Sequence, residues 1–92
     1  MHMMPLNFPY PSCSFDATKS RVDFWGYDNV FEVSFHLEAD ALKKLCPLMG
    51  DTEVEFLRAF GSAWKRIHEV AVRIYGRGGK STYTFILTAK DF

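Results

Sequence analysis

The chain of 92 residues lacks an excess of charge of either sign, because 11 Lys and Arg residues balance 11 Asp and Glu residues. Global electrostatics therefore gives no argument for nucleic acid or an anionic membrane as a partner. The sequence also lacks any apolar run near the roughly 18 residues of a membrane span. Its N-terminus lacks the charged-then-apolar order of a secretory signal. These absences predict a cytoplasmic protein without a membrane-spanning segment.

Cysteine is scarce, and no internal repeat is present. Cys13 and Cys46 are isolated thiols without the paired spacing of a redox or zinc motif, so free, reduced cysteines are expected. No metal and no other cofactor is predicted. The length suits a single domain over residues 1–92. Residues 1–3 have the character of a cloning remnant or a disordered start, and residues 4–20 are expected to form an extended, proline-rich arm.

What the sequence does have is one long amphipathic segment. From about Thr52 to Tyr75, apolar residues recur at steps of three and four, which predicts a helix with a wide apolar stripe. Thr52 and Glu55 predict a capping box at its start, and Gly76 predicts its end. Trp64 is expected to lie between this helix and the apolar face of a sheet. The stripe consists of Leu57, Phe60, Trp64, Ile67, Ala71 and Ile74, flanked by Phe56, Ala63 and Val70.

The segment from Arg21 to Leu37 has the alternation of a β-hairpin, with a predicted two-residue turn at Asp28 and Asn29. Because successive side chains of a strand point to opposite faces, this register assigns each residue to one of two faces. The apolar face, which is expected to form the core, holds Val22, Phe24, Phe31, Val33, Phe35 and Leu37. The other face holds Arg21, Asp23, Trp25, Tyr27, Val30, Glu32, Ser34 and His36.

The remaining segments complete an α+β fold. Residues 38–46 predict a short helix that ends before Pro47, residues 82–89 predict a final strand, and residues 14–20 predict a loop or a single helical turn. The expected architecture is a small antiparallel sheet, made of the hairpin and the C-terminal strand, packed on one long and one short helix. The order is β-β-α-α-β after the arm. The arm is expected to cover the core or form an edge strand, or alternatively to dock on a partner.

Several stretches together carry a family resemblance. They are Arg21 to Asn29; Ala41, Leu42 and Leu45; Leu87 to Phe92; Leu6 to Pro9; and Phe15 with Asp16. The chain resembles in them the small bacterial proteins of domain-of-unknown-function family 1488. The resemblance implies a compact α+β fold and a bacterial cytoplasmic source. It implies no activity and no catalytic residues, because the family has none assigned. Asn29, where such sequences often have Gly, departs from the pattern and affects only the turn type.

No group of residues predicts a reaction. The glycine-rich stretch 76–80 superficially suggests a phosphate loop, but these glycines follow a helix instead of preceding one, so a helix end and a solvated turn is the interpretation. His36, His68, Cys46 and Asp91 are each capable of acid–base or nucleophilic chemistry. None has a partner at a spacing that would orient it. The expectation is a protein that is not an enzyme.

The long helix has a basic side, which makes Arg58, Lys65, Arg66 and Arg73 candidate phosphate contacts. Clustered cations are the footprint of nucleic-acid binding. The alternative is an ordinary solvated face, because Glu69 and Arg73 form an i,i+4 pair and the helix dipole favours cations near a C-terminus.

A second candidate surface is the outward face of the sheet, where Trp25, Tyr27 and Ile86 are expected. Their combined apolar area is too large to leave bare as one patch. Either the proline-rich arm covers it, or it is a contact surface for a protein. The leading hypothesis is a non-enzymatic protein-interaction module that forms a homodimer or binds another protein. Weak nucleic-acid binding by the helix over 52–75 is the alternative.

Overall fold

The helices and strands of the computed structural model are described over residues 6–8, 13–28, 31–77 and 84–92. In chain order they are β1 (Leu6–Asn7), β2 (Cys13–Asp16), β3 (Arg21–Asp28), β4 (Phe31–Glu38), α1 (Ala39–Leu45), α2 (Glu53–Arg77), β5 (Thr84–Leu87) and the 3-10 helix η1 (Ala89–Asp91). The predicted α+β class, with one long and one short helix, is confirmed. Among these residues no helix combines the length and the apolar composition needed to cross a membrane.

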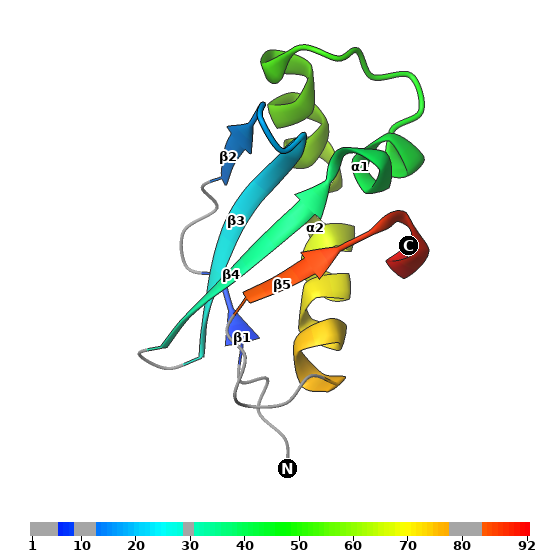
Figure 1. Ribbon diagram of the computed structural model, residues 1–92. Coiled ribbons are helices and arrows are strands. Elements are labelled where there is room, and N and C mark those ends of the chain that lie inside the picture. Colours follow the sequence, from blue (N-terminus) through cyan, green and yellow to red (C-terminus); the bar gives the residue numbers. More distant parts are fainter. Residues whose placement is uncertain (1–5, 9–12, 29–30, 78–83) are drawn as a thin grey trace.

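The five strands form one mixed sheet in the order β1-β3-β4-β5, with β2 also paired to β3 (Figure 1). The pairs made by β3 are antiparallel, whereas β5 runs parallel to β4. The prediction of an antiparallel sheet is therefore wrong for the last strand. The reason is the length of α2: at about 1.5 Å per residue it returns the chain along the whole sheet. The chain therefore enters β5 at the end where β4 begins.

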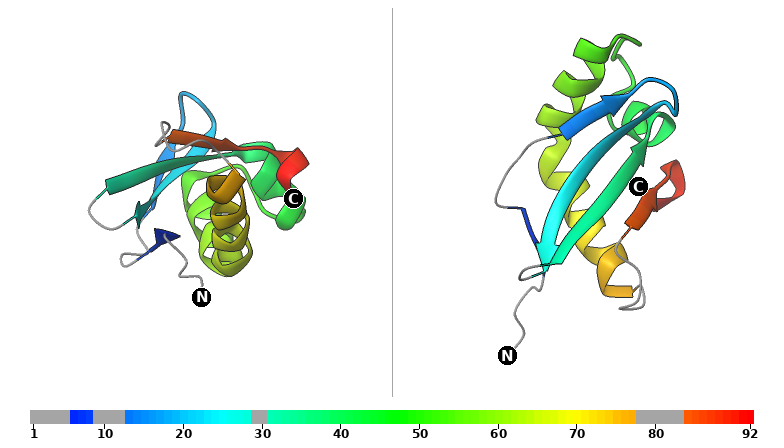
Figure 2. Two further views of the ribbon diagram at one scale, coloured as in Figure 1. Left: turned by 90° about the horizontal axis from the view of Figure 1, so that it is seen from below. Right: turned by 60° about the vertical axis from the view of Figure 1, so that its left-hand side comes forward.

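Both helices lie on one side of the sheet, as the left view of Figure 2 shows. The side toward the helices is called the inner face below, and the opposite side the outer face. The inner face contributes Val22, Phe24, Val33, Phe35, Leu37 and Leu87, all no more than 1% exposed. The buried residues of α2 that meet them are Phe56, Ala59, Phe60, Ile67, Val70 and Ala71.

The hairpin has the predicted faces although its turn is displaced. Asp28 is the last residue of β3 and pairs with Phe31, so the predicted turn at Asp28 and Asn29 is wrong. The connection falls on residues 29–30, which lie outside the described residues. The observed strand pairing is shifted by two residues from the predicted one, which leaves every side chain on its predicted face. Phe24 accordingly pairs with Phe35 on the inner face. Phe31, which was expected in the core, is nevertheless 56% exposed at the end of the hairpin.

The prediction that Trp64 lies between helix and sheet is wrong, because its side chain is 45% exposed. Phe60 takes the central position instead, with its ring 5.2 Å from that of Phe24. Trp64 lies at the margin of the apolar stripe of α2. Its ring meets the His68 ring edge-on, with 5.1 Å between the ring centroids. The apolar stripe of α2 is wide, so its periodicity does not determine which of its residues face the sheet. In the structure Ile67 is buried and Trp64 is not.

The ends of α2 agree with the prediction at the start and differ at the finish. The Glu55 N–H donates to Thr52 Oγ1 at 3.2 Å, which is the first half of the predicted capping box. Gly76 was expected to end the helix, but α2 continues through it to Arg77. No described glycine has a positive φ, so Gly76 does not adopt the left-handed conformation of a helix cap.

The N-terminal arm forms edge strands and covers the core. Leu6 is 3% exposed, and the Phe8 ring lies 6.0 Å from both Phe24 and Phe35. The arm therefore packs on the inner face, and Phe8 does not cover Trp25. Residues 9–12, which include Tyr10, lie outside the described residues.

The arm lies close to Gly26, and β2 replaces a predicted loop. A Cβ atom at Gly26 would lie 2.8 Å from the Phe8 ring and 2.9 Å from the Leu6 side chain, so any larger residue there would force the arm to shift. The prediction of a loop or helical turn over residues 14–20 is wrong for β2, whose Phe15 stacks on Phe56 at 4.6 Å. Alternation over four residues is too short a signal to identify such a strand from sequence.

Candidate protein interface

The outer face of the sheet has no described helix or strand lying across it. The pairing of the strands assigns the predicted interface residues Trp25, Tyr27 and Ile86 to this face. Its described residues come from all five strands: Asn7, Ser14, Asp16, Arg21, Asp23, Trp25, Tyr27, Glu32, Ser34, His36, Glu38, Thr84 and Ile86.

Cross-strand pairing arranges these residues in rows. Trp25 pairs with Ser34, which pairs with Thr84, and in the next row His36 pairs with Ile86. Neighbouring strands are about 4.8 Å apart, so the Trp25 and Ile86 positions are separated by roughly 10 Å across the sheet. Trp25 is partly buried and Ile86 is 55% exposed. Trp25 and Ile86 therefore lie on either side of small and polar side chains, and they do not form one continuous apolar patch.

A charged cluster lies in the middle of this face. His36 Nδ1 lies 2.7 Å from Asp23 Oδ1, and because an ionised carboxylate only accepts, Nδ1 is the nitrogen that donates. Arg21 Nε is 3.1 Å from the same oxygen. That N–H makes no hydrogen bond of acceptable geometry, so the contact is an ion pair. Asp23 thus fixes both the ring orientation of His36 and the position of Arg21.

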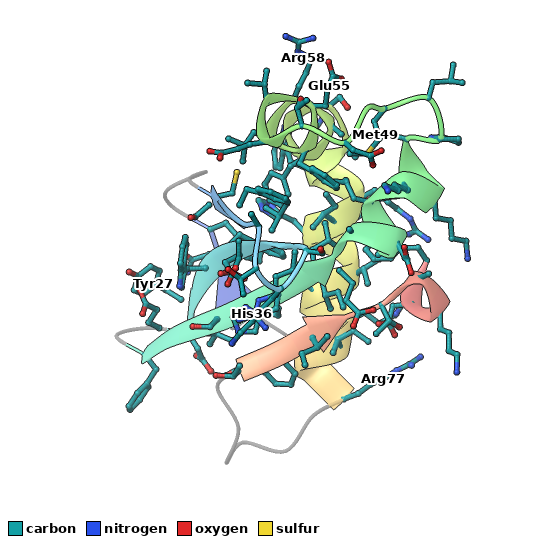
Figure 3. All side chains as sticks on the ribbon, turned by 45° about the horizontal axis from the view of Figure 1, so that its top comes forward. Tyr27, His36, Met49, Glu55, Arg58 and Arg77 are labelled. Carbon is teal, nitrogen blue, oxygen red and sulfur yellow. The ribbon has the colours of Figure 1, made fainter. Side chains whose placement is uncertain are left out.

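Tyr27 lies at the hairpin end of the same face. Its hydroxyl donates to Glu32 Oε2 at 3.1 Å across the strand pair. Figure 3 shows that Tyr27 and His36 project from the strands, whereas Met49, Glu55 and Arg58 gather around the start of α2. The outer face is therefore separated from the features of the helix side.

The basic side of α2 is largely occupied by contacts within the chain. Arg73 Nη2 donates to the carbonyl of Asp91 at 2.7 Å. Arg58 and Arg66 each lie 3.7 Å from a glutamate three residues away, Glu55 and Glu69 respectively. Lys65 is exposed and makes no ion pair with a described residue. Of the four predicted phosphate contacts, only Lys65 thus lacks a polar partner among the described residues.

Two hollows lined by described residues adjoin α2, and neither was predicted. The larger, about 410 Å³, lies between the loop after α1 and the first turns of α2. Beside it Leu48 is 99% and Val54 60% exposed. The lining residues are Cys46, Pro47, Leu48, Met49, Glu55, Arg58, Ala59 and Ser62. The exposed position of Leu48 follows from the path of a loop, which hydrophobic periodicity does not determine.

The second hollow, about 310 Å³, lies between the arm and the other side of α2. His68 stacks on Phe8 at 3.9 Å in its wall. The ring is half-buried, and this burial lowers the pKa of His68 below its ordinary value. The imidazole is therefore a neutral packing group at neutral pH, with Trp64 at its edge.

The residues considered for chemistry lie apart. Cys46 Sγ is near the Ala59 carbonyl at 3.9 Å, and Asp91 Oδ2 accepts from the Thr88 N–H at 2.7 Å. Burial raises the pKa of the other free thiol, Cys13. Among the described residues no group of three or more His, Cys, Asp and Glu side chains is placed to hold a metal ion. The structure thus brings together Asp23 and His36, a pair that spacing along the sequence did not reveal.

One further ion pair joins α1 to the loop that follows it. Lys43 Nζ lies 2.7 Å from Asp51 Oδ1, and this hydrogen bond and the charge of Asp51 raise the pKa of Lys43. Both groups are well exposed, so the contribution to stability is small.

These features define a small α+β protein in which two helices cover one face of a mixed sheet and leave the other without a described covering element. The chain belongs to the family described as protein of unknown function (DUF1488), whose profile matches residues 6–87. The family resemblance of the sequence is thereby confirmed. No curated protein and no solved structure matches the chain.

Proposed function

We propose that this chain is a non-enzymatic protein-interaction module that binds a protein partner through the outer face of its sheet. The observation that carries the proposal is the contrast between the faces: α1 and α2 both lie on the inner side. Ile86 is 55% exposed on the other side. An aromatic and an aliphatic side chain interspersed with charged groups have the mixed apolar and polar composition of a protein interface.

The arrangement of the ionisable groups supports a binding role over catalysis. Catalysis needs a base, an orienting group and a reacting group within hydrogen-bond reach of one another. Asp23 and His36 supply the first two, and no described hydroxyl or thiol is hydrogen-bonded to His36. The free thiols Cys13 and Cys46 support a reducing compartment, and we place the protein in the bacterial cytoplasm.

The test is a matched pair of substitutions. Ile86→Thr replaces an exposed apolar side chain of the outer face by a polar one of the same branching, and Val54→Thr does the same at a site of similar exposure at the start of α2. Each variant and the wild type are immobilised, and the proteins retained from a nuclease-treated bacterial lysate are compared quantitatively. Sedimentation velocity of the same three proteins detects self-association.

The proposal requires a contact, to another protein or to a second copy, that wild type and Val54→Thr retain and Ile86→Thr loses. Equal retention and equal association by both variants would show that the outer face is not the contact surface. Nucleic-acid binding by the basic side of α2 stays a prediction. Lys65→Glu should weaken it, and the affinity should fall steeply with salt.

A further inference from the structure

The outer face differs from the whole chain in its charge. The chain is neutral overall, yet the described residues of this face include four carboxylates and one guanidinium, that of Arg21. The carboxylates belong to Asp16, Asp23, Glu32 and Glu38. Four carboxylates against one guanidinium give these side chains an excess of three negative charges.

Only one of these carboxylates is neutralised. Asp23 is paired with Arg21 and His36. Among the described residues, the donors to Asp16 and Glu32 are uncharged: the Lys19 backbone N–H and the Tyr27 hydroxyl. Glu38 makes no hydrogen bond from its side chain to the α1 N-terminus, although it precedes that helix. Counting Lys19 of the adjoining turn as well, the surface stays acidic.

The excess of positive charge lies on the helix layer. The cations of α2 are Arg58, Lys65, Arg66, Arg73 and Arg77, and its acids are Glu53, Glu55 and Glu69. The molecule is therefore polarised from an acidic sheet side to a basic helix side. Such a field steers a cationic partner toward the outer face and an anionic one away from it.

This charge opposes the a priori favoured partner, a second copy facing the first across a two-fold axis. In a two-fold contact the same patch is present on both sides. Four carboxylates of one copy would then meet four of the other with only one arginine from each. Like charges brought together at an interface disfavour association.

The size of the face points the same way. Its longest strands have eight residues and span roughly 26 Å, and four strands span about 14 Å from first to last. The projected area is roughly 400 Å², and an extended segment of about eight residues lying along the strands would span its length. A short segment suits this area better than a whole domain.

Resting on the proposed function, we infer that the occupant of the outer face is a short cationic protein segment in which Arg or Lys residues flank apolar ones. Arginine forms charge-assisted bonds with carboxylates, and its guanidinium stacks on an indole such as that of Trp25. Ile86, 55% exposed, contributes the apolar contact.

The probes are two fluorescently labelled synthetic peptides of equal length, one alternating Arg with Val and Leu, the other with Glu in place of Arg. Binding is measured by anisotropy at low and at high salt. The test variant is Glu32→Gln with Glu38→Gln, because glutamine keeps the shape of both side chains and still accepts from Tyr27. The matched control is Glu53→Gln with Glu69→Gln, which removes two exposed carboxylates from α2. Circular dichroism verifies that every variant is folded.

The expected result is that the Arg peptide binds wild type at low salt and the Glu peptide does not. The outer-face double variant should weaken binding about fivefold or more, and the control double variant less than about twofold. High salt should reduce the difference, because exposed charges are screened.

Three results overturn the inference. Failure of the Arg peptide to bind wild type, or equal effects of the two double variants, removes the cationic partner. Two-fold dimerisation of the wild type that Ile86→Thr abolishes identifies a second copy as the occupant. In each case the proposed function survives if Ile86→Thr still abolishes a contact that Val54→Thr retains, and it fails with the inference if that pair also behaves alike.

Discussion

The inner and outer faces of β3 and β4 share one backbone and differ in almost everything else. On the inner face Phe24 and Phe35 are no more than 1% exposed and stack at 5.1 Å. On the outer face their neighbours Asp23 and His36 form a hydrogen-bonded polar pair. The side chains on the inner face therefore supply the stability. Those on the outer face are available for recognition and, under the proposed function, contact the partner. A substitution should change stability or binding according to its face, and this separation can be tested.

The largest expected effect is on the inner face. Phe24 contacts the rings of Phe8, Phe35, Phe60 and His68. Phe24→Ala should lower the free energy of unfolding by about 3–5 kcal/mol, the usual cost of a cavity at a buried aromatic. Urea denaturation followed by circular dichroism measures it.

Trp64→Ala is the matched control for Phe24→Ala, since Trp64 is also a large aromatic but 45% exposed. It should cost about 1–2 kcal/mol, because less apolar area is removed from water in the fold. If Trp64→Ala costs as much as Phe24→Ala, the margin of α2 contributes to the core and the assignment of Trp64 is incorrect.

The faces of the hairpin could be predicted from the sequence, and the rotation of α2 could not. A strand repeats every two residues, so even a displaced turn left Phe24 and Trp25 on their predicted sides. A helix presents a broader stripe, and α2 has apolar residues on both margins of it. In the structure the margin beside Trp64 is occupied by His68, on which Phe8 of the arm stacks. That contact joins residues 60 positions apart and leaves no local signal.

The direction of β5 and the arrangement of the candidate site also depend on long-range contacts that sequence patterns do not reveal. Alternation over 82–89 predicted a strand, but only the return path of α2 makes it parallel to β4. The residues Trp25, Tyr27 and Ile86 were placed on one face correctly. The pairing between strands decides that Ser34 and His36 lie between Trp25 and Ile86. Because this register has no local signal in the sequence, the separation of the apolar residues could not be predicted.

A second prediction tests how the arm supports the inner face. A Cβ at Gly26 would meet Phe8, Leu6 and, at 3.2 Å, the backbone oxygen of Asn7. Gly26→Ala should therefore displace β1 and destabilise the fold by about 1–3 kcal/mol. Hydrogen exchange at Asn7 and Tyr27 should accelerate, because these residues pair across the displaced strand.

Gly61→Ala is the control for Gly26→Ala, since a Cβ at Gly61 has no atom within 4 Å. Gly61 lies inside α2, so alanine there should stabilise the protein by about 0.5–1 kcal/mol. Destabilisation by Gly61→Ala, or neutrality of Gly26→Ala, would contradict the close approach of the arm.

A third, smaller effect is a dependence of the free energy of unfolding on pH, caused by His68 at the margin of the inner face. Burial lowers the pKa of His68, so the unfolded chain takes up a proton at a pH where the folded chain does not. The free energy of unfolding is therefore unaffected above the unfolded pKa of about 6.5. It falls as pH decreases from there to the lower folded pKa.

The variant His68→Phe isolates this dependence, because phenylalanine can keep the stacking on Phe8 without titrating. Between pH 7 and about 5.5 the wild type should lose more stability than His68→Phe. Parallel pH profiles of the two proteins would show that His68 is as accessible to protons in the fold as in the unfolded chain.

The smallest effect on stability is expected at Ile86, and its neighbour Leu87 makes the contrast between the faces sharpest. The two residues are consecutive in β5, with Ile86 55% and Leu87 0% exposed. Ile86→Thr keeps β-branching on an exposed site and should change the free energy of unfolding by less than about 0.5 kcal/mol. Leu87→Thr places a hydroxyl in the core and should cost about 2–4 kcal/mol. Urea denaturation of both variants measures the difference, and equal losses would mean that the outer face is part of the core and not a surface for recognition.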